Sequence, residues 1–274
     1  MRVGNRSKWS IALLAVLLVM PTASGCGKKE TIKVGIEQNF RPFTYMEDGE
    51  KKGFEVDLWQ AIAQKAGIQY ELVPMEHGEL LKSLKSGGVD LALAGMTVSN
   101  ARKNNLDYSS PYFQTGLVVL TSTDNGVIKG KDDLTQKVVA TKNGSTAFNY
   151  AGEIQGAKIR SYSNIADIYN ELKNNTVDAA IFDERNAHDF LQDKAQGQVK
   201  MVGQAFNKER YAVVGKKRND YIGKVNKGIE AVSKDGTYET MYTKWFGSKP
   251  DVMPDKIKKD MEYEMQHETV KGRE

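Results

Sequence analysis

The chain has 274 residues, of which 40% are hydrophobic, so it is long enough for one large core or for two lobes around a cleft. Its formal net charge of +4 falls to +1 when the first 25 residues, with three basic and no acidic side chains, are left out. A nearly neutral body with interspersed Lys and Glu excludes an extended nucleic-acid-binding surface. A single cysteine excludes an intramolecular disulfide and a thiolate metal cluster.

The N-terminus has the pattern of a signal peptide. Residues 1–25 combine a basic start, an almost wholly apolar stretch at 9–20 and small residues before Cys26. The apolar stretch is too short to span a bilayer comfortably as a helix. The segment before Cys26 is similar to a bacterial lipobox, although Ala23 stands where Leu is usual. We therefore expect cleavage before Cys26, acylation of this cysteine, and a tether over residues 26–31 that anchors the protein outside the cell membrane; an incidental cysteine after an ordinary secretion signal is the alternative.

Strands and helices alternate through the first half of the chain. We expect strands at 32–36, 68–73 and 91–94, a helix after Gly53 that runs to Lys65 and stops at Gly67, a helix at 79–85, and an exposed turn at 47–50. Glu55 and Asp57, at the start of the first helix, are expected to be solvated or capping charges. This alternation predicts an α/β fold with a parallel, helix-covered sheet, whose ligands bind at the carboxyl ends of the strands.

The same alternation restarts in the second half. Extended segments are predicted at 106–108, 116–120, 138–141, 158–161, 179–182 and 211–214, and helices at 146–150, 165–172, 221–233 and 238–245. Residues 251–274 are rich in charges and poor in large apolar side chains. They predict a frayed helix or a disordered tail without a role in the chemistry.

The stretch from Asp90 to Arg102 has the features of an anion-binding site. A buried strand meets a loop at Gly95, Thr97 offers a hydroxyl, and Ser99 is a good N-cap for a short polar helix. Arg102 falls in the first turn of that helix. Backbone N–H groups, a hydroxyl and a guanidinium together suit a carboxylate.

Sequence motifs of enzymes are scarce. The histidines at 77, 188 and 267 are far apart, and the sequence has no Gly-x-Ser-x-Gly elbow, no phosphate-binding loop and no dinucleotide-binding glycine pattern. We therefore expect a binding protein without a catalytic residue, metal or cofactor.

Several motifs in their order resemble one family. They are Gly-Phe-Glu-Val-Asp-Leu at 53–58, Val-Asp-Leu-Ala-Leu-Ala-Gly-Met-Thr at 89–97, Asp-Tyr-Ser at 107–109 with Pro-Tyr at 111–112, Gly-Thr-Tyr at 236–238 and Lys-Trp-Phe-Gly at 244–247. Over about residues 32–248 the chain resembles the amino-acid-binding branch of bacterial extracellular solute-binding proteins, the receptors of ABC importers, and within it the glutamine-binding members. The resemblance implies a monomer that docks on permease subunits.

The resemblance also implies a two-lobed type II periplasmic-binding-protein fold. The first lobe would comprise residues 32–112 and 211–250, and the second lobe residues 113–210. Crossover strands would fall near 112–116 and 208–211, and the lobes would close over the ligand as a hinge.

Ligand contacts follow from the resemblance, position by position. Arg102 is implied to hold the α-carboxylate with the region of Ala94, Gly95 and Thr97, and Thr146 would add a backbone donor from the second lobe. Asp183 would take the α-ammonium with Thr97; a plain helix-capping role for Asp183 is the alternative.

Side-chain specificity would depend on Glu37, Phe40, His77 and Lys142, with Phe40 alternatively a core residue. A carboxylate opposite an ammonium complements both ends of a primary amide, which favours glutamine. Arginine or lysine is the alternative ligand. A periplasmic dehydratase and the ligand-sensing domain of a receptor are the alternatives from other classes.

Overall fold

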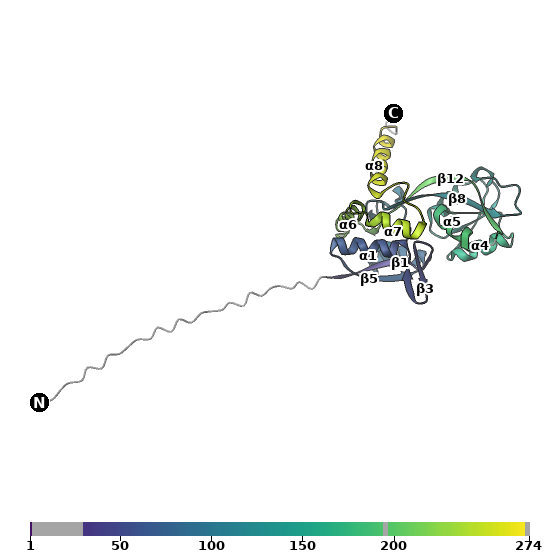
Figure 1. The fold of residues 1–274 in the computed structure, drawn as a ribbon. Helices are drawn as coiled ribbons and strands as arrows, with labels where there is room; N and C mark the ends of the chain where they lie inside the picture. Colours follow the sequence, from purple (N-terminus) through teal and green to yellow (C-terminus); the bar gives the residue numbers. More distant parts are fainter. Residues whose placement is uncertain (2–29, 194–196, 272–274) are drawn as a thin grey trace.

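The structure is a computed structural model that describes residues 1, 30–193 and 197–271. Two α/β bodies lie beside each other and are connected by the long strands β8 (Phe113–Ser122) and β12 (Val199–Tyr211) (Figure 1). We call the body that contains β1 the first lobe and the body that contains α4 and α5 the second lobe. The expected signal peptide and Cys26 lie outside the described residues.

The first lobe is built on a five-stranded sheet with the order β5-β1-β6-β13-β7. Its strands are β1 (Thr31–Glu37), β5 (Gln69–Met75), β6 (Leu91–Leu93), β7 (Leu106–Tyr108) and β13 (Val214–Lys216). β1 is parallel to β5 and β6, as the alternation predicts. The expectation of a wholly parallel sheet is wrong for β13, which is antiparallel to β6 and β7 because the chain enters it on its return from the second lobe.

Four helices belong to the first lobe: α1 (Phe54–Ala66), α2 (His77–Ser86), α6 (Ile222–Lys234) and α7 (Thr237–Phe246). Leu58 and Ile62, one turn apart on α1, are fully buried. Gly67 ends α1 in the left-handed conformation (φ 65°), which glycine adopts without strain. α2 begins at His77, earlier than the predicted start at residue 79. This earlier start puts His77 in the first turn, next to the end of β1.

The second lobe has a five-stranded sheet with the order β10-β9-β11-β8-β12. The other strands and α-helices of this lobe within the described residues are β9 (Val138–Lys142), β10 (Lys158–Tyr162), β11 (Ala179–Asp183), α3 (Thr146–Glu153), α4 (Ile165–Lys173) and α5 (Glu184–Asp193). β9 is parallel to β10 and β11, and β8 is antiparallel to β11 and β12. α5 follows directly on β11, where the sequence indicated a helix only through the alternative role of Asp183 as a helix cap.

A small sheet of three strands follows β1. It consists of β2 (Asn39–Phe40), β3 (Thr44–Glu47) and β4 (Glu50–Lys52). Asp48 (φ 52°) and Gly49 (φ 80°) form the turn between β3 and β4, and positive φ at both positions is what a two-residue hairpin of this twist requires. The predicted turn at 47–50 is therefore right, whereas strands of two to four residues give too little periodicity to be predicted.

The two strands that connect the lobes pair with each other. Phe113 of β8 lies opposite Tyr211 of β12, and Gly116 lies opposite Lys208, so the predicted crossover segments are neighbours. The rings of Phe113 and Tyr211 stack at 5.6 Å, and Phe43 contacts both at 4.9 and 5.3 Å between ring centroids. This buried aromatic cluster fixes the first-lobe end of the connection.

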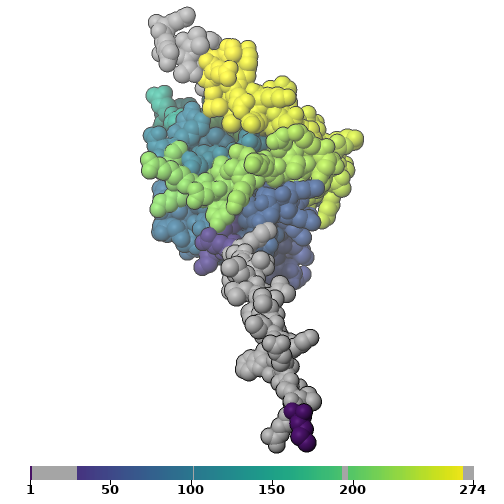
Figure 2. Space-filling view, turned by 90° about the vertical axis from the view of Figure 1, so that its left-hand side faces the viewer, coloured from purple at the N-terminus to yellow at the C-terminus, as the bar shows by residue number. Residues whose placement is uncertain are grey.

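The C-terminal segment forms a helix, α8 (Pro254–Lys271), which projects from one end of the molecule (yellow in Figures 1 and 2). Of the two expected alternatives, the helix is therefore right for the described part. Glu264 of α8 pairs with Lys208 at 2.8 Å and with Arg210 at 2.7 Å, both on β12. No helix within the described residues is both long and apolar enough for a membrane span.

Candidate functional site

The carboxyl ends of parallel strands from both lobes meet at one small cavity. Glu37 is the last residue of β1, Lys142 the last of β9 and Asp183 the last of β11, and Gly95 follows β6. The cavity has a volume of about 20 Å³ and is lined by Glu37, Phe40, His77, Ala94, Gly95, Met96, Thr97, Arg102, Lys142, Ser145, Thr146 and Asp183. All ten residues predicted to bind ligand are thus brought together; that they bind a ligand stays a prediction.

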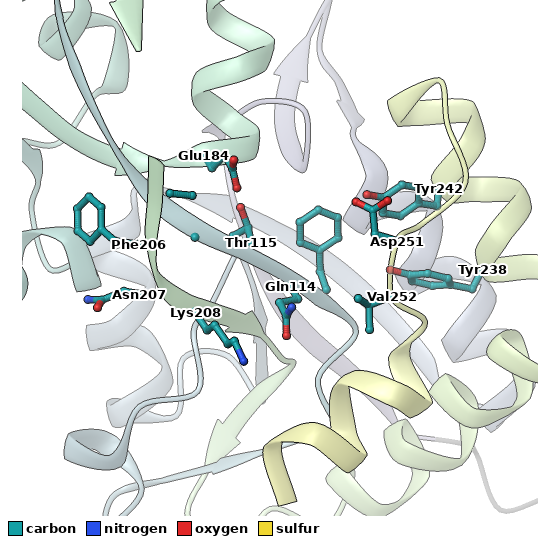
Figure 3. Close-up of a pocket in the computed structure, with 13 residues that line it drawn as sticks. Gln114, Thr115, Glu184, Phe206, Asn207, Lys208, Tyr238, Tyr242, Asp251 and Val252 are labelled. Carbon is teal, nitrogen blue, oxygen red and sulfur yellow. The ribbon is translucent and has the colours of Figure 1, made fainter. Parts of the chain in front are cut away.

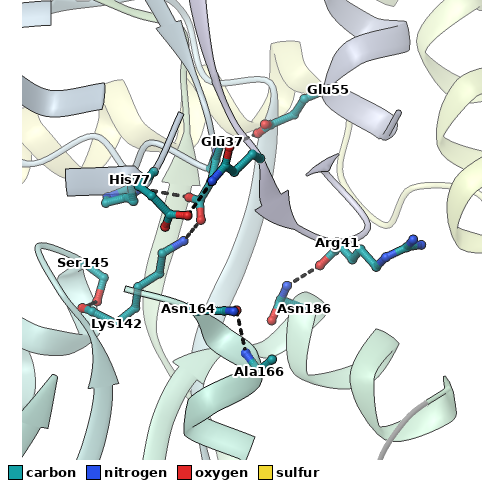
Figure 4. Close-up of polar contacts among 12 residues, drawn as sticks. Glu37, Arg41, Glu55, His77, Lys142, Ser145, Asn164, Ala166 and Asn186 are labelled. Atoms are coloured by element: carbon teal, nitrogen blue, oxygen red, sulfur yellow. Dashed lines mark hydrogen bonds and ion pairs between the residues drawn. The ribbon is translucent and has the colours of Figure 1, made fainter. Parts of the chain in front are cut away.

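One end of the cavity is formed by Glu37, His77 and Lys142 (Figure 4). The carboxylate of Glu37, only 2% exposed, accepts a hydrogen bond from Nζ of Lys142 and lies 3.1 Å from Nδ1 of His77. Burial by itself would raise the pKa of Glu37, but the charges and hydrogen bonds of Lys142 and His77 outweigh it and hold the pKa below its usual value. Glu37 is therefore a carboxylate, and it holds a cation.

Phe40 completes this end of the cavity. Its ring lies with the centroid 5.1 Å from Nζ of Lys142, within the range of a cation–π interaction. The ring also packs against the backbone of Gly95, since a Cβ at that position would stand 2.4 Å from Cε1 of Phe40. Gly95 has φ +56°, so both its conformation and the ring favour glycine. Phe40 is buried, at 3% exposed, and it both packs in the core and lines the site.

The lining of the cavity also contains Arg102, Thr97, Thr146 and Asp183. Nη2 of Arg102 donates to the carbonyl of Gly144 in the second lobe at 2.7 Å. Oδ1 of Asp183 accepts from the hydroxyl of Tyr211 at 2.6 Å. Burial, followed by the negative charge of Glu209, raises the pKa of Asp183 to about 7, against the hydrogen bond from Tyr211. A cation beside Asp183 would therefore relieve an unfavourable buried charge.

Arg102 lies on a shorter element than predicted. Only a single turn of 3-10 helix, Asn100–Arg102, follows Ser99, and the side chain of Ser99 makes no capping hydrogen bond. The prediction of an N-capped polar helix is therefore wrong, because the turn ends after three residues. The guanidinium nevertheless reaches the cavity.

Two buried carboxyl groups near the cavity were missed in the sequence. Glu209 of β12 is 3% exposed and accepts a hydrogen bond from the hydroxyl of Thr146 at 2.9 Å. Between two basic residues in the sequence, Glu209 looks like part of a solvated charged stretch. The pairing of β12 with β8, which no local pattern shows, turns its side chain inward.

Glu55 is the second missed carboxyl group, and its assignment as a solvated or capping charge is wrong. It is fully buried, and its Oε1 accepts from the hydroxyl of Tyr112 at 2.5 Å and from the backbone N–H of Gly95 at 2.8 Å. Burial raises the pKa of Glu55 to about 7, against these two hydrogen bonds. Glu55 thus holds the Gly95 loop in place through its backbone N–H. Asp57, in contrast, lies at the surface and pairs with Lys244.

The lobes contact each other across the cleft through polar groups. Lys142 reaches from β9 to Glu37 of the first lobe, and the side-chain amide of Asn186 on α5 donates to the carbonyl of Arg41 (Figure 4). With Arg102 and Gly144, these contacts hold the two lobes close together.

A larger cavity, of about 310 Å³, lies on another side of the connection between the lobes (Figure 3). Its lining comes from β8, β12, α7, the start of α5 and the segment before α8, and includes Gln114, Glu184, Lys208 and Tyr242. None of the ten predicted residues lines it. We place the candidate site in the smaller cavity, because buried groups of opposite charge converge there.

Comparison with known proteins shows the family of the chain. Residues 32–248 match the family of bacterial extracellular solute-binding proteins, family 3. The L-cystine-binding protein TcyJ of Escherichia coli is 32% identical over 225 residues, which cover 81% of this chain and 84% of that protein.

Solved structures agree in fold. The arginine-, lysine-, histidine-binding protein ArtJ of Geobacillus stearothermophilus superposes with a TM-score of 0.78 at 30% identity, covering 81% of this chain and 97% of that one. An ancestral arginine-binding protein, 36% identical, has been solved bound to arginine (TM-score 0.75, 79% and 98% covered) and bound to glutamine (TM-score 0.73, 80% and 98% covered). The fold is that of type II periplasmic binding proteins, and the predicted fold class is confirmed. The chain belongs to the bacterial extracellular solute-binding proteins of family 3, and it is a binding protein and not an enzyme.

Proposed function

We propose that this chain is the receptor of an ABC importer for a polar amino acid, and that its solute is a cationic amino acid, with arginine as the first candidate. The observation that carries this proposal is the ammonium group of Lys142, which lies between the carboxylate of Glu37 and the ring of Phe40. A buried carboxylate beside an aromatic face is a favourable place for a cation. The guanidinium of an arginine ligand would take the position of this ammonium as Lys142 withdraws.

The solute would be held at both ends. Arg102, Thr97 and Thr146 would bind its α-carboxylate, and Asp183 its α-ammonium, so that only a free amino acid satisfies both. We place the first lobe at 32–112 and 211–250 and the second at 113–210, with the hinge where β8 and β12 pair. A ligand that touches both lobes favours the closed arrangement through those contacts alone.

Glutamine is the second candidate. It was the first choice from sequence, because the amide can accept from Lys142 and donate to Glu37 without displacing either. The ancestral relative solved with glutamine supports it, whereas the relatives that are named for arginine support a cationic solute. Nε2 of His77 is buried and has no hydrogen-bond partner among the described residues. It can therefore donate to or accept from either ligand.

A panel of solutes decides between these candidates. Calorimetric titration of the chain from residue 27 with arginine, lysine, histidine, glutamine and cystine is expected to give the lowest Kd for arginine. Tighter binding of glutamine than of arginine would overturn the cationic assignment, and no binding of any amino acid would overturn the proposed function.

Replacing Glu37 by glutamine is expected to weaken arginine binding by about tenfold or more, because a charge-assisted hydrogen bond contributes roughly 1.5–3 kcal/mol. Glutamine binding should change much less. Glu79→Gln, an exposed carboxylate on the same helix as His77, is the matched control and should leave both affinities unchanged. If Glu37→Gln weakened both ligands equally, Glu37 would not belong to a side-chain subsite.

We also propose that Cys26 carries the lipid anchor, which residues 27–31 would connect to β1. In cells that express the full chain, Cys26→Ser is expected to release the protein from the membrane fraction and to abolish labelling by a radioactive fatty acid. Retention of the variant in the membrane would point to an uncleaved signal segment as the anchor instead.

A further inference from the structure

Glu209 occupies the groups that a ligand's α-carboxylate would use. Its Oε2 accepts a hydrogen bond from the hydroxyl of Thr146 at 2.9 Å, and Thr97 is near enough to lower the pKa of the same side chain. Thr97 belongs to the first lobe and Thr146 to the second. One carboxylate of the protein therefore lies beside a threonine of each lobe.

Glu209 lies among groups that favour an anion, but a second carboxyl group, Asp183, lies nearby. Burial raises the pKa of Glu209, while the two threonine hydroxyls and the charge of Arg102 oppose the rise. Asp183 is close enough for the charge of Glu209 to raise its pKa. Thr97, Thr146 and Arg102 thus stabilise the Glu209 carboxylate, and they are the same three residues that we assign to the α-carboxylate of the solute. Glu209 uses the hydroxyl of Thr146, whereas the solute is expected to use its backbone N–H as well.

We propose that Glu209 is an internal competitor for the α-carboxylate subsite, so that a solute binds only as its carboxylate displaces that of Glu209 from Thr97 and Thr146. This inference rests on the proposed function, because it requires a solute with a free α-carboxylate. Two carboxylates cannot share these donors without repulsion, and the hydrogen bonds that Glu209 loses are subtracted from the binding free energy of the solute. Glu209 therefore lowers the affinity for every amino acid, whatever its side chain.

Lys142 would compete in the same way for the subsite of a cationic side chain. Its ammonium donates to Glu37, where the solute's side chain would bind, just as the Glu209 carboxylate accepts from Thr146. The cleft thus contains one cation and one anion of the protein in the subsites that we assign to the solute. The contribution of Glu209 can be measured separately, because it concerns the part that all amino acids share.

Two variants test the role of Glu209. Glu209→Ala removes the competing carboxylate, and Glu209→Gln keeps the shape and an oxygen acceptor but removes the charge. The Kd of whichever amino acid the wild type binds best is expected to fall about tenfold in Glu209→Ala, the equivalent of one hydrogen bond to a charged group, and less in Glu209→Gln. Glu153→Gln, an exposed carboxylate at the far end of α3, is the matched control and should bind as the wild type does.

A ligand without the α-carboxylate shows whether the competition is with that group. If arginine is the solute, the Kd of agmatine, its decarboxylated analogue, is expected to be unchanged by Glu209→Ala. The inference would be overturned if both folded variants bound the amino acid no more tightly than the wild type does. It would also be overturned if Glu209→Ala lowered the Kd of agmatine as much as that of arginine. A solute other than arginine would correct the proposed function and still leave the sign of the Glu209 effect to decide this inference. If neither the wild type nor the variants bound any amino acid, both proposals would be wrong.

Discussion

Replacing Arg102 by alanine is expected to weaken the binding of every amino acid by at least ~2 kcal/mol, about 30-fold in Kd, because the α-carboxylate would be buried without its charged partner. The loss should be the same for arginine and glutamine, since both carry the same α-carboxylate. Titration calorimetry of the wild type and the variant with both solutes measures it.

The hydrogen bond from Arg102 to Gly144 offers a second explanation for such a loss, because it joins the two lobes. Agmatine distinguishes the loss of the α-carboxylate contact from the loss of the contact between the lobes, since it lacks the α-carboxylate. If Arg102 acts through that group, Arg102→Ala should leave the Kd of agmatine nearly unchanged, whereas loss of the lobe contact would weaken both ligands. Arg160→Ala, an exposed arginine on β10, is the control for removal of a guanidinium. A loss of affinity for arginine without an equal loss for glutamine would contradict the assignment of Arg102 to the α-carboxylate, because both amino acids carry that group.

Glu55 is expected to make the folded chain less stable as the pH rises. Its pKa is about 7 in the folded chain against an ordinary value of 4.5, so the folded state binds its proton more tightly than the unfolded state. The stabilisation by protonated Glu55 is therefore complete below about pH 4.5 and is lost as the pH rises through 7. Between pH 5 and pH 8 this share of the unfolding free energy amounts to roughly 2–3 kcal/mol.

Glu55→Gln mimics the protonated form. The amide oxygen can still accept from Tyr112 and Gly95, and the amide NH₂ replaces Oε2, which has no partner among the described residues. Urea unfolding at pH 5 and pH 8 should show that the variant loses roughly 2–3 kcal/mol less between the two pH values than the wild type does. Asp183, with a pKa of about 7, keeps a dependence of the same sign in both proteins. The surface control Glu153→Gln is expected to show the same difference in unfolding free energy between pH 5 and pH 8 as the wild type. If Glu55→Gln also showed the wild-type difference, Glu55 would be ionised in the fold.

Much of the fold could be predicted from local pattern. The buried strand β11 and the helix α4, with its Asn164 N-cap, come from runs whose periodicity and flanking residues are clear within ten residues. The alternation of strands and helices predicted that ligands bind at the carboxyl ends of the strands. The assignment of Glu37, Lys142 and Asp183 to one site came from the family resemblance, and the structure places all three in the lining of one cavity.

The parts that failed depend on pairing between distant segments. A single strand was predicted at 211–214, but Tyr211 ends β12 and Val214 begins β13. β12 has 13 residues, and much of its length is exposed and polar, so its sequence lacks the apolar alternation of a half-buried strand. Glu209 lies on that strand, and its burial follows from contacts that neither neighbour in sequence makes. Glu55 was missed because a helix N-terminus is an ordinary place for an exposed acid.

The volume of the cleft cavity has a kinetic consequence. A space of about 20 Å³ has room for about one water molecule and none for an amino acid. Entry and exit of solute must therefore wait until the contacts of Arg102, Lys142 and Asn186 across the cleft have parted. The rates of loading and unloading therefore depend on how often these contacts across the cleft open, as well as on how often solute meets the protein.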